Sequence, residues 1–218
     1  MEHADRHGLR MLQVMLGAYQ SAWLALEGRF EQADALLADN LRQAALATFP
    51  FRTEAVTAAR ATIALWRGEP EVTLELFRGL TEATATDTDT GVLIGLIRSG
   101  RLAPAAAMLD RRPVSLDADS FAAPFDFAIL AEAALVVGRP ELAGRLYPLM
   151  LPWAGRTAAA GTGPPLGPID AFLAAAAAAV GEIDVARRHA DDAARLCASW
   201  PAPVVADWLA DLRARYGF

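Results

Sequence analysis

The sequence contains no lysine, only one cysteine and no long apolar run. All twenty basic side chains are arginines, against 26 acidic residues, which gives a net charge of −6. Because a surface that binds a phosphate backbone needs a basic patch, this balance argues against direct binding of nucleic acid. The single cysteine, Cys197, cannot form an internal disulfide. The most apolar run, 171–180, has ten residues, whereas a membrane-spanning helix needs about 20.

Residues 1–10 also lack an apolar core of the length found in a signal peptide. We therefore expect a cytoplasmic protein without a membrane segment.

The sequence is rich in alanine and leucine, and 54% of its 218 residues are hydrophobic. Both residue types favour helices, and alternating stretches of β-branched residues are scarce. The length and composition predict one all-α domain that spans residues 1–218 and buries a sizeable core.

Five glycines share one local pattern. Each follows an apolar helical stretch, and each is followed two residues later by an apolar residue or proline and five residues later by a small residue. The glycines are Gly28, Gly68, Gly100, Gly138 and Gly181. They stand 32 to 43 residues apart, close to the period of tetratricopeptide and related helix-pair repeats. A left-handed glycine ends a helix and proline favours the start of the next, so each glycine predicts a turn between two helices.

These turns predict an all-α, tetratricopeptide-like α-α superhelix of about five helix pairs plus a C-terminal capping helix. The expected pairs are 6–27 with 30–46, 52–67 with 70–83, 88–99 with 102–110, 122–137 with 140–151, and 168–180 with 182–198, and the capping helix is 203–215.

The small residue after each turn predicts close contact between paired helices. We expect four of these residues to be buried, Ala33, Ala105, Ala143 and Ala186. The residue seven positions before the glycine is also small in four of the five helix pairs, each of which we call a unit. The third unit has Leu93 at this position. Its two helices should therefore pack more loosely or at another angle.

Two segments resemble a known family. They are L-A-L-E-G-R-F-E-Q-A at 24–33 and Y-P-L-M-L-P-W-A-G-R at 147–156, the latter followed by a Gly-rich loop and by G-P-I-D at 167–170. The chain resembles the C-terminal tetratricopeptide-like region of bacterial signal-transduction ATPases, the LuxR-type transcriptional regulators and adenylate-cyclase-associated ATPases. The resemblance implies a sensor or scaffold arm that controls an ATPase or DNA-binding domain, either fused to it or separate.

The motifs that could carry catalysis or hold a cofactor are weak. The Gly-rich stretch 161–167 has no lysine and no preceding strand, so it predicts a stiff surface connection rather than a phosphate-binding loop, with Asp170 near the positive end of the next helix. His3 and His7 have no suitable third ligand nearby, and a metal site there is not expected.

His189 and Cys197 are eight residues apart on one predicted helix, about 12 Å and too far for a catalytic pair. The sequence predicts a surface histidine and a packed cysteine. Because no catalytic motif is present, we expect no enzyme activity and no cofactor.

The binding surface is predicted from the repeat geometry. In a tetratricopeptide array the first helix of each pair lines the concave face, and the polar or aromatic residues on this face include Trp66, Arg98 and Glu132. The loop 152–168 adds Trp153 and Arg156. We expect these five residues to bind a protein segment or peptide.

Three alternatives stay open. The superhelix could close on itself and bury the concave face. The concave face and the loop 152–168 could instead form a small-molecule sensor pocket, or an enzyme site could be assembled from scattered residues. The sequence leaves the ligand and the oligomeric state undefined.

Overall fold

The computed structural model describes residues 9–46, 48–84, 87–111, 116–161 and 163–218, and this part of the chain is helical. Its elements are α2 (Arg10–Leu26), α3 (Phe30–Ala45), α4 (Arg52–Arg67), α5 (Pro70–Thr84), α6 (Asp89–Arg98), α7 (Leu102–Arg111), α8 (Ala123–Val137), α9 (Pro140–Met150), the 3₁₀ turn η1 (Leu151–Trp153), α10 (Ile169–Ala179), α11 (Ile183–Ser199) and α12 (Pro203–Tyr216). No strand occurs among these residues, which confirms the prediction of an all-α fold.

The five glycines of the repeated pattern each follow the end of a helix, as the sequence predicted. Their φ angles lie between 71° and 87°, in the left-handed region that favours glycine. In all five turns the N–H of the residue after the glycine donates to the carbonyl oxygen five residues earlier, as Arg29 does to Leu24. This bond satisfies a carbonyl at the helix end that would otherwise lack a partner. The repeated sequence pattern therefore codes for one repeated local structure.

The predicted small residues lie where consecutive helices meet. Ala33, Ala105, Ala143 and Ala186 are fully buried, which confirms that prediction. In the second unit Thr73 takes this place, and its hydroxyl donates to the carbonyl of Ala61 at 3.0 Å. Each pair of helices thus approaches through a small contact residue.

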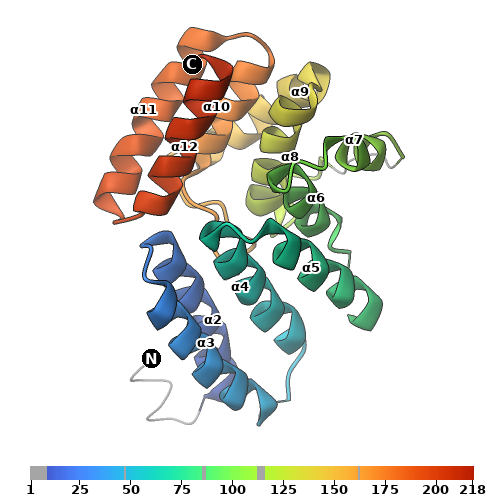
Figure 1. Ribbon diagram of the computed structural model, residues 1–218, viewed down its shortest axis with the longest axis vertical. Coiled ribbons are helices and arrows are strands. Elements are labelled where there is room, and N and C mark those ends of the chain that lie inside the picture. The colour runs from blue at the N-terminus through green and yellow to red at the C-terminus, as the bar shows by residue number, and fades with distance from the viewer. Residues whose placement is uncertain (1–8, 47, 85–86, 112–115, 162) are drawn as a thin grey trace.

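The third unit departs from the others. Only Ala105 of α7 is buried, and α7 lies at the edge of the molecule (Figure 1). Helix α6 instead packs tightly on α5. A Cβ built at Gly95 would stand 2.9 Å from the backbone Cα of Leu74, and one at Gly91 would stand 2.5 Å from the ring of Phe77. The unit therefore makes its closest contact with the preceding helix.

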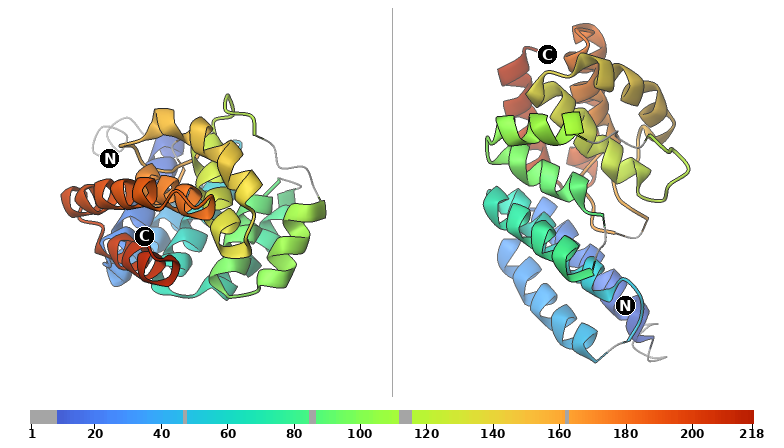
Figure 2. Two further views of the ribbon diagram at one scale, coloured as in Figure 1. Left: turned by 90° about the horizontal axis from the view of Figure 1, so that it is seen from above. Right: turned by 90° about the vertical axis from the view of Figure 1, so that its right-hand side faces the viewer.

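The helices form two main groups of packed side chains. One core joins α2, α3 and α4 with Cys197 of α11 and Val205 of α12. The other joins α6 to α11 with residues of α4, α5 and α12, namely Leu65, Leu74, Leu209 and Leu212. Figures 1 and 2 show α2–α5 in one half of the molecule and α8–α12 in the other. Helix α12 therefore contributes to both cores.

The Gly-rich loop after α9 is not the surface connection that the sequence predicted. Residues 164–168 are buried, and Ala158 and Leu166 belong to the larger core. Ala158 and Leu166 are hydrogen-bonded across the loop, and Ile169 donates to Arg156. Gly167 has φ of 113°, and a Cβ there would stand 2.8 Å from Val205. The loop folds inward because its apolar residues pack against α12.

None of the described helices is long and apolar enough to cross a membrane.

Candidate functional site

Arg98 and Glu132 form a largely buried ion pair between α6 and α8. Nη2 of Arg98, at the end of α6, donates a hydrogen bond to Oε2 of Glu132 on α8 at 2.9 Å. Nε lies 2.5 Å from Oε1 as an ion-pair contact without a hydrogen-bonding angle. The two side chains are 16% and 2% exposed. The pair is therefore largely removed from water and held in a two-point geometry.

Aromatic side chains enclose this pair. The guanidinium carbon of Arg98 lies 5.1 Å from the ring centroid of Trp66 and 4.3 Å from that of Trp208. The two indoles contact edge to face at 5.8 Å, and Phe172 lies 5.3 Å from Trp208. Such contacts stabilise the cation through the ring quadrupoles. The residues come from α4, α6, α8, α10 and α12, so the cluster ties the two halves together.

The structure brings together three of the predicted binding residues but does not leave them accessible. Trp66 is 6% exposed and packs against Trp208 of the last helix, and Glu132 is 1% exposed. Trp66 and Glu132 are therefore enclosed by the chain itself, and Arg98 neutralises Glu132. Contact of these residues with a partner stays a prediction. One alternative from the sequence was that the chain closes on itself and buries the concave face. The burial of these residues agrees with that alternative.

The two other predicted residues lie elsewhere. Trp153 ends η1 and packs half-buried against Phe127, with ring centroids 5.8 Å apart. Arg156 is exposed at the start of the loop. No contact joins these two residues to the Arg98–Glu132 pair among the described residues. They remain available to a partner.

A separate apolar groove lies along α2. We call it the α2 groove. It has a volume of about 500 Å³, and its lining residues are Met11, Leu12, Met15, Leu16, Tyr19, Phe49, Pro50, Phe51 and Gly161. Met11 is 52% exposed and Phe51 is 68% exposed. Large apolar side chains exposed together on one face are typical of a surface that binds another molecule.

Phe51 adopts an unusual backbone conformation in this groove. Its φ is 62° and its ψ is 15°, in the left-handed region. This conformation costs a residue with a side chain roughly 1–2 kcal/mol. A bulky apolar residue that is both strained and exposed is not explained by packing within the chain, and such strain often occurs at binding sites.

The sequence analysis did not identify the α2 groove. The signal was present, since Met11, Met15 and Tyr19 repeat every four residues, as do Leu12 and Leu16. Two such rows widen the apolar surface of one helix beyond what a single partner helix covers. The predicted concave face used another face of this helix, which is buried with residues of α3 and α4.

A third cluster contains the histidine that the sequence placed at the surface. His189 on α11 is only 15% exposed at its side chain, and it lies between Tyr147 on α9 and Asp170 on α10. Asp170 stands in the first turn of α10, as predicted, and accepts the Gly155 N–H at 2.6 Å. Burial acts to raise the pKa of Asp170, but the nearby His189 and the Gly155 N–H outweigh it and lower that pKa. Asp170 is therefore a carboxylate at neutral pH.

Cys197 belongs to another core, with residues of α2, α3 and α4. Burial raises the pKa of its thiol to about 11, so it is protonated at neutral pH and poorly nucleophilic. His3 and His7 lie outside the described residues.

The chain matches no protein-family model, no curated protein and no solved structure.

Proposed function

We propose that this chain is a non-catalytic interaction or sensor module of a bacterial transcriptional or signalling regulator, built as a tetratricopeptide-like superhelix that binds a protein segment. The resemblance of residues 24–33 and 147–156 to LuxR-type regulators and related ATPases favours this class, as does the shared hydrogen bonding of the five glycine turns. In this proposal the binding surface is the α2 groove. The observation that carries it is the row of exposed apolar side chains on α2 that no described helix covers.

The shape of the groove suits a helix. Met11, Met15 and Tyr19 follow one i, i+4 ridge of α2, and Leu12 and Leu16 follow the next. The furrow between two such ridges accepts the side chains of another helix. The longer ridge, from Met11 to Tyr19, extends over nine residues and rises by about 12 Å, which corresponds to two helical turns of a partner. An amphipathic helix with apolar residues at i, i+3, i+4 and i+7 fits this surface.

The charge beside the groove indicates what the partner carries. Two arginines adjoin groove residues in the sequence, Arg10 next to Met11 and Arg52 next to Phe51. Arg10 donates to the carbonyl of Leu46 and Arg52 to that of Ala44, so both lie near the end of α3. The bond that Arg10 donates to Leu46 uses only some of the five donors of its guanidinium. A partner helix with an acidic residue on its polar face would complement this positive charge.

A small-molecule sensor is the second candidate function. The observation that favours it is Gly161 of the loop after η1, which forms one wall of the α2 groove. A volume of about 500 Å³ lies within the usual range for small-ligand pockets, roughly 300–1,000 Å³. The pocket would then use α2 and the loop rather than the concave face.

The test is calorimetric titration of the full chain with a synthetic amphipathic helix that has a leucine stripe and glutamates on its polar face. Met15→Asp should weaken binding at least tenfold, because burial of a methionine side chain contributes about 1.5–3 kcal/mol. Gln20→Asp is the matched control, since Gln20 is exposed on the same helix outside the groove. It should leave the affinity unchanged.

Two peptide controls sharpen this test. A scrambled peptide with the same composition should not bind, and a peptide with lysines in place of the glutamates should bind more weakly. Equal affinity of the parent chain and Met15→Asp would contradict the proposal. If only a small apolar dye bound, and Met15→Asp removed that binding, the sensor pocket would replace the peptide groove.

Phe51→Gly separates binding from stability. Removal of the strained φ should raise the free energy of unfolding by about 1 kcal/mol, while loss of the exposed ring should weaken peptide binding. Chemical denaturation and the same titration measure the two effects. A variant that is less stable and binds equally well would show that Phe51 serves the fold rather than the groove.

A further inference from the structure

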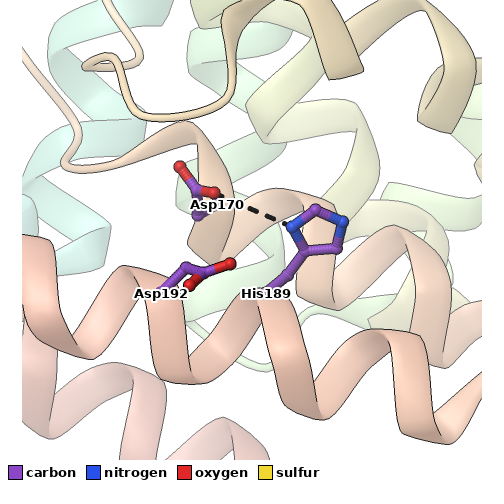
Figure 3. Close-up of side chains that lie close together, drawn as sticks. All are labelled: Asp170, His189 and Asp192. Carbon is purple, nitrogen blue, oxygen red and sulfur yellow. Dashed lines mark ion pairs between the residues drawn. The ribbon is translucent and has the colours of Figure 1, made fainter.

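Three potential metal ligands converge between α10 and α11. Asp170, His189 and Asp192 each offer a ligand atom, and these atoms lie within 4.8 Å of one another. Figure 3 shows the two carboxylates and the imidazole directed into the space between the helices. His189 and Asp192 are three residues apart on α11, which places them on one face of that helix.

The position of the His189 ring is fixed by Tyr147. Nε2 lies 2.9 Å from the tyrosine hydroxyl oxygen, and the two rings contact edge to face at 5.7 Å. Nδ1 therefore points towards Asp170. It is buried and has no hydrogen-bond partner among the described residues, because its 3.7 Å separation from Oδ1 of Asp170 exceeds a hydrogen-bond length. When Nε2 is the protonated nitrogen, Nδ1 presents a free lone pair at this point.

A hydrogen bond also fixes the orientation of Asp170. Its Oδ2 accepts the Gly155 N–H at 2.6 Å, which leaves Oδ1 directed at His189. Asp192 supplies the third ligand, a second carboxylate. Its side chain is 44% exposed and pairs with Arg195 on the outer surface of α11. The cluster thus has two buried, oriented ligands and one that borders solvent, which provides a path for an ion and room for water ligands.

We propose that Asp170, His189 and Asp192 bind a divalent first-row metal ion of the zinc type. One imidazole and two carboxylates, with water in the remaining position, form a donor set that suits Zn²⁺. In a tetrahedral site the ligand atoms stand about 3.5 Å apart, so the 3.7 Å between Nδ1 and Oδ1 needs little adjustment. Asp192 closes the site by a rotation of its exposed side chain.

The contacts behind the ligands have the arrangement expected at a metal site. A histidine that binds metal through one nitrogen donates its other N–H to an oxygen, which fixes the ring. Here that oxygen is the Tyr147 hydroxyl. The bound ion would join α10 and α11 and hold the loop that ends at Pro168. This function is independent of the peptide groove.

The test uses the full chain, without a histidine tag and after treatment with a chelator. Titration with ZnCl₂ should show one ion bound per chain and a raised thermal midpoint, and Co²⁺ should give the visible absorption of a tetrahedral site. His189→Asn should weaken Zn²⁺ binding at least a hundredfold. Tyr147→Phe should weaken it about tenfold, because it removes only the orienting oxygen.

Asp192→Asn keeps the test decisive if the histidine variant does not fold. Its side chain is partly exposed, so the substitution should preserve the fold and still weaken Zn²⁺ binding at least tenfold. Asp184→Asn is the matched control, since Asp184 has the same i, i+3 pairing, with Arg187, on the same helix. Its affinity should equal that of the parent chain.

A double substitution, His3→Ala with His7→Ala, tests the other histidines of the chain and should leave binding intact. The proposal is overturned if the parent chain binds no Zn²⁺, if Asp192→Asn binds as tightly as Asp184→Asn, or if binding disappears with His3 and His7. In the first case Asp170 and His189 form an ion pair only.

Discussion

At the scale of single residues, the ion pair of Arg98 and Glu132 shows why a buried charge depends on its partner. Both groups lose hydration on folding, and each recovers part of that loss from the other and from the indole rings. Removal of one partner leaves the other charge uncompensated in a region of low dielectric constant. The energetic effect of such a change should therefore exceed that of losing the contact itself.

Arg98→Met should lower the free energy of unfolding by about 3–5 kcal/mol, because Glu132 remains buried without a counter-charge. Addition of Glu132→Leu in the same chain should restore most of this loss. Chemical denaturation of the two single variants, the double variant and the parent gives the coupling energy.

Arg139→Met is the control for this measurement. Arg139 contacts both carboxylate oxygens of Asp110 at 2.9 and 3.0 Å, but the pair is exposed. Its loss should cost less than about 1 kcal/mol. If Arg98→Met and Arg139→Met had equal effects, the central pair would not behave as a buried one.

At the scale of the helices, the small residue after each turn sets the distance between the two paired helices. Ala33 lies at the contact of α3 with α2 and is fully buried, whereas Ala35, two residues later, points to solvent. The two positions share the same helix and the same residue type. They therefore separate the effect of packing from that of helix propensity.

Ala33→Leu should lower the free energy of unfolding by about 1–3 kcal/mol, because the larger side chain forces the two helices apart. Ala35→Leu should change it by less than about 0.5 kcal/mol. Thermal and urea unfolding of both variants provide the measurement. An Ala33→Leu variant as stable as the parent would contradict the helix contact described for the first unit.

The difference between local turns and contacts of separate helices explains which features the sequence could predict. Turn chemistry is local, since a glycine, the apolar residue after it and a small residue five positions later lie within one segment. The boundaries of the helices and the burial of Ala33, Ala105, Ala143 and Ala186 could therefore be predicted from the pattern. The packing of α6 on α5 through Gly95 could not, because it depends on how separate units meet.

At the scale of the whole molecule, tertiary placement decides which predicted residues remain accessible. The repeat pattern assigned Trp66, Arg98 and Glu132 to one predicted surface, and in the structure Arg98 contacts both of the other two residues in the interior. It did not predict that α12 would cover that surface with Trp208. The cluster around His189 was missed for the same reason, since Tyr147, Asp170 and His189 come from three helices and share no local motif.

Trp208 is a residue of α12 that packs against both cores. It lies beside Trp66 and Arg98 from the first half of the sequence and beside Phe172 from the second. Trp200, in the turn before α12, contacts only Trp23 among the described aromatic rings. Both tryptophans are half-buried, so they form a matched pair for truncation.

Trp208→Ala should lower the free energy of unfolding by about 3 kcal/mol, because it removes aromatic contacts on both sides and reopens the cover over Arg98 and Glu132. It should also broaden or divide the calorimetric transition, since the cores of the two halves lose a shared side chain. Trp200→Ala should cost less and keep one transition. If both variants unfolded in a single transition with equal losses, the coupling of the two halves would run through other contacts, such as that of α5 with α6 at Leu74 and Gly95, instead of through Trp208.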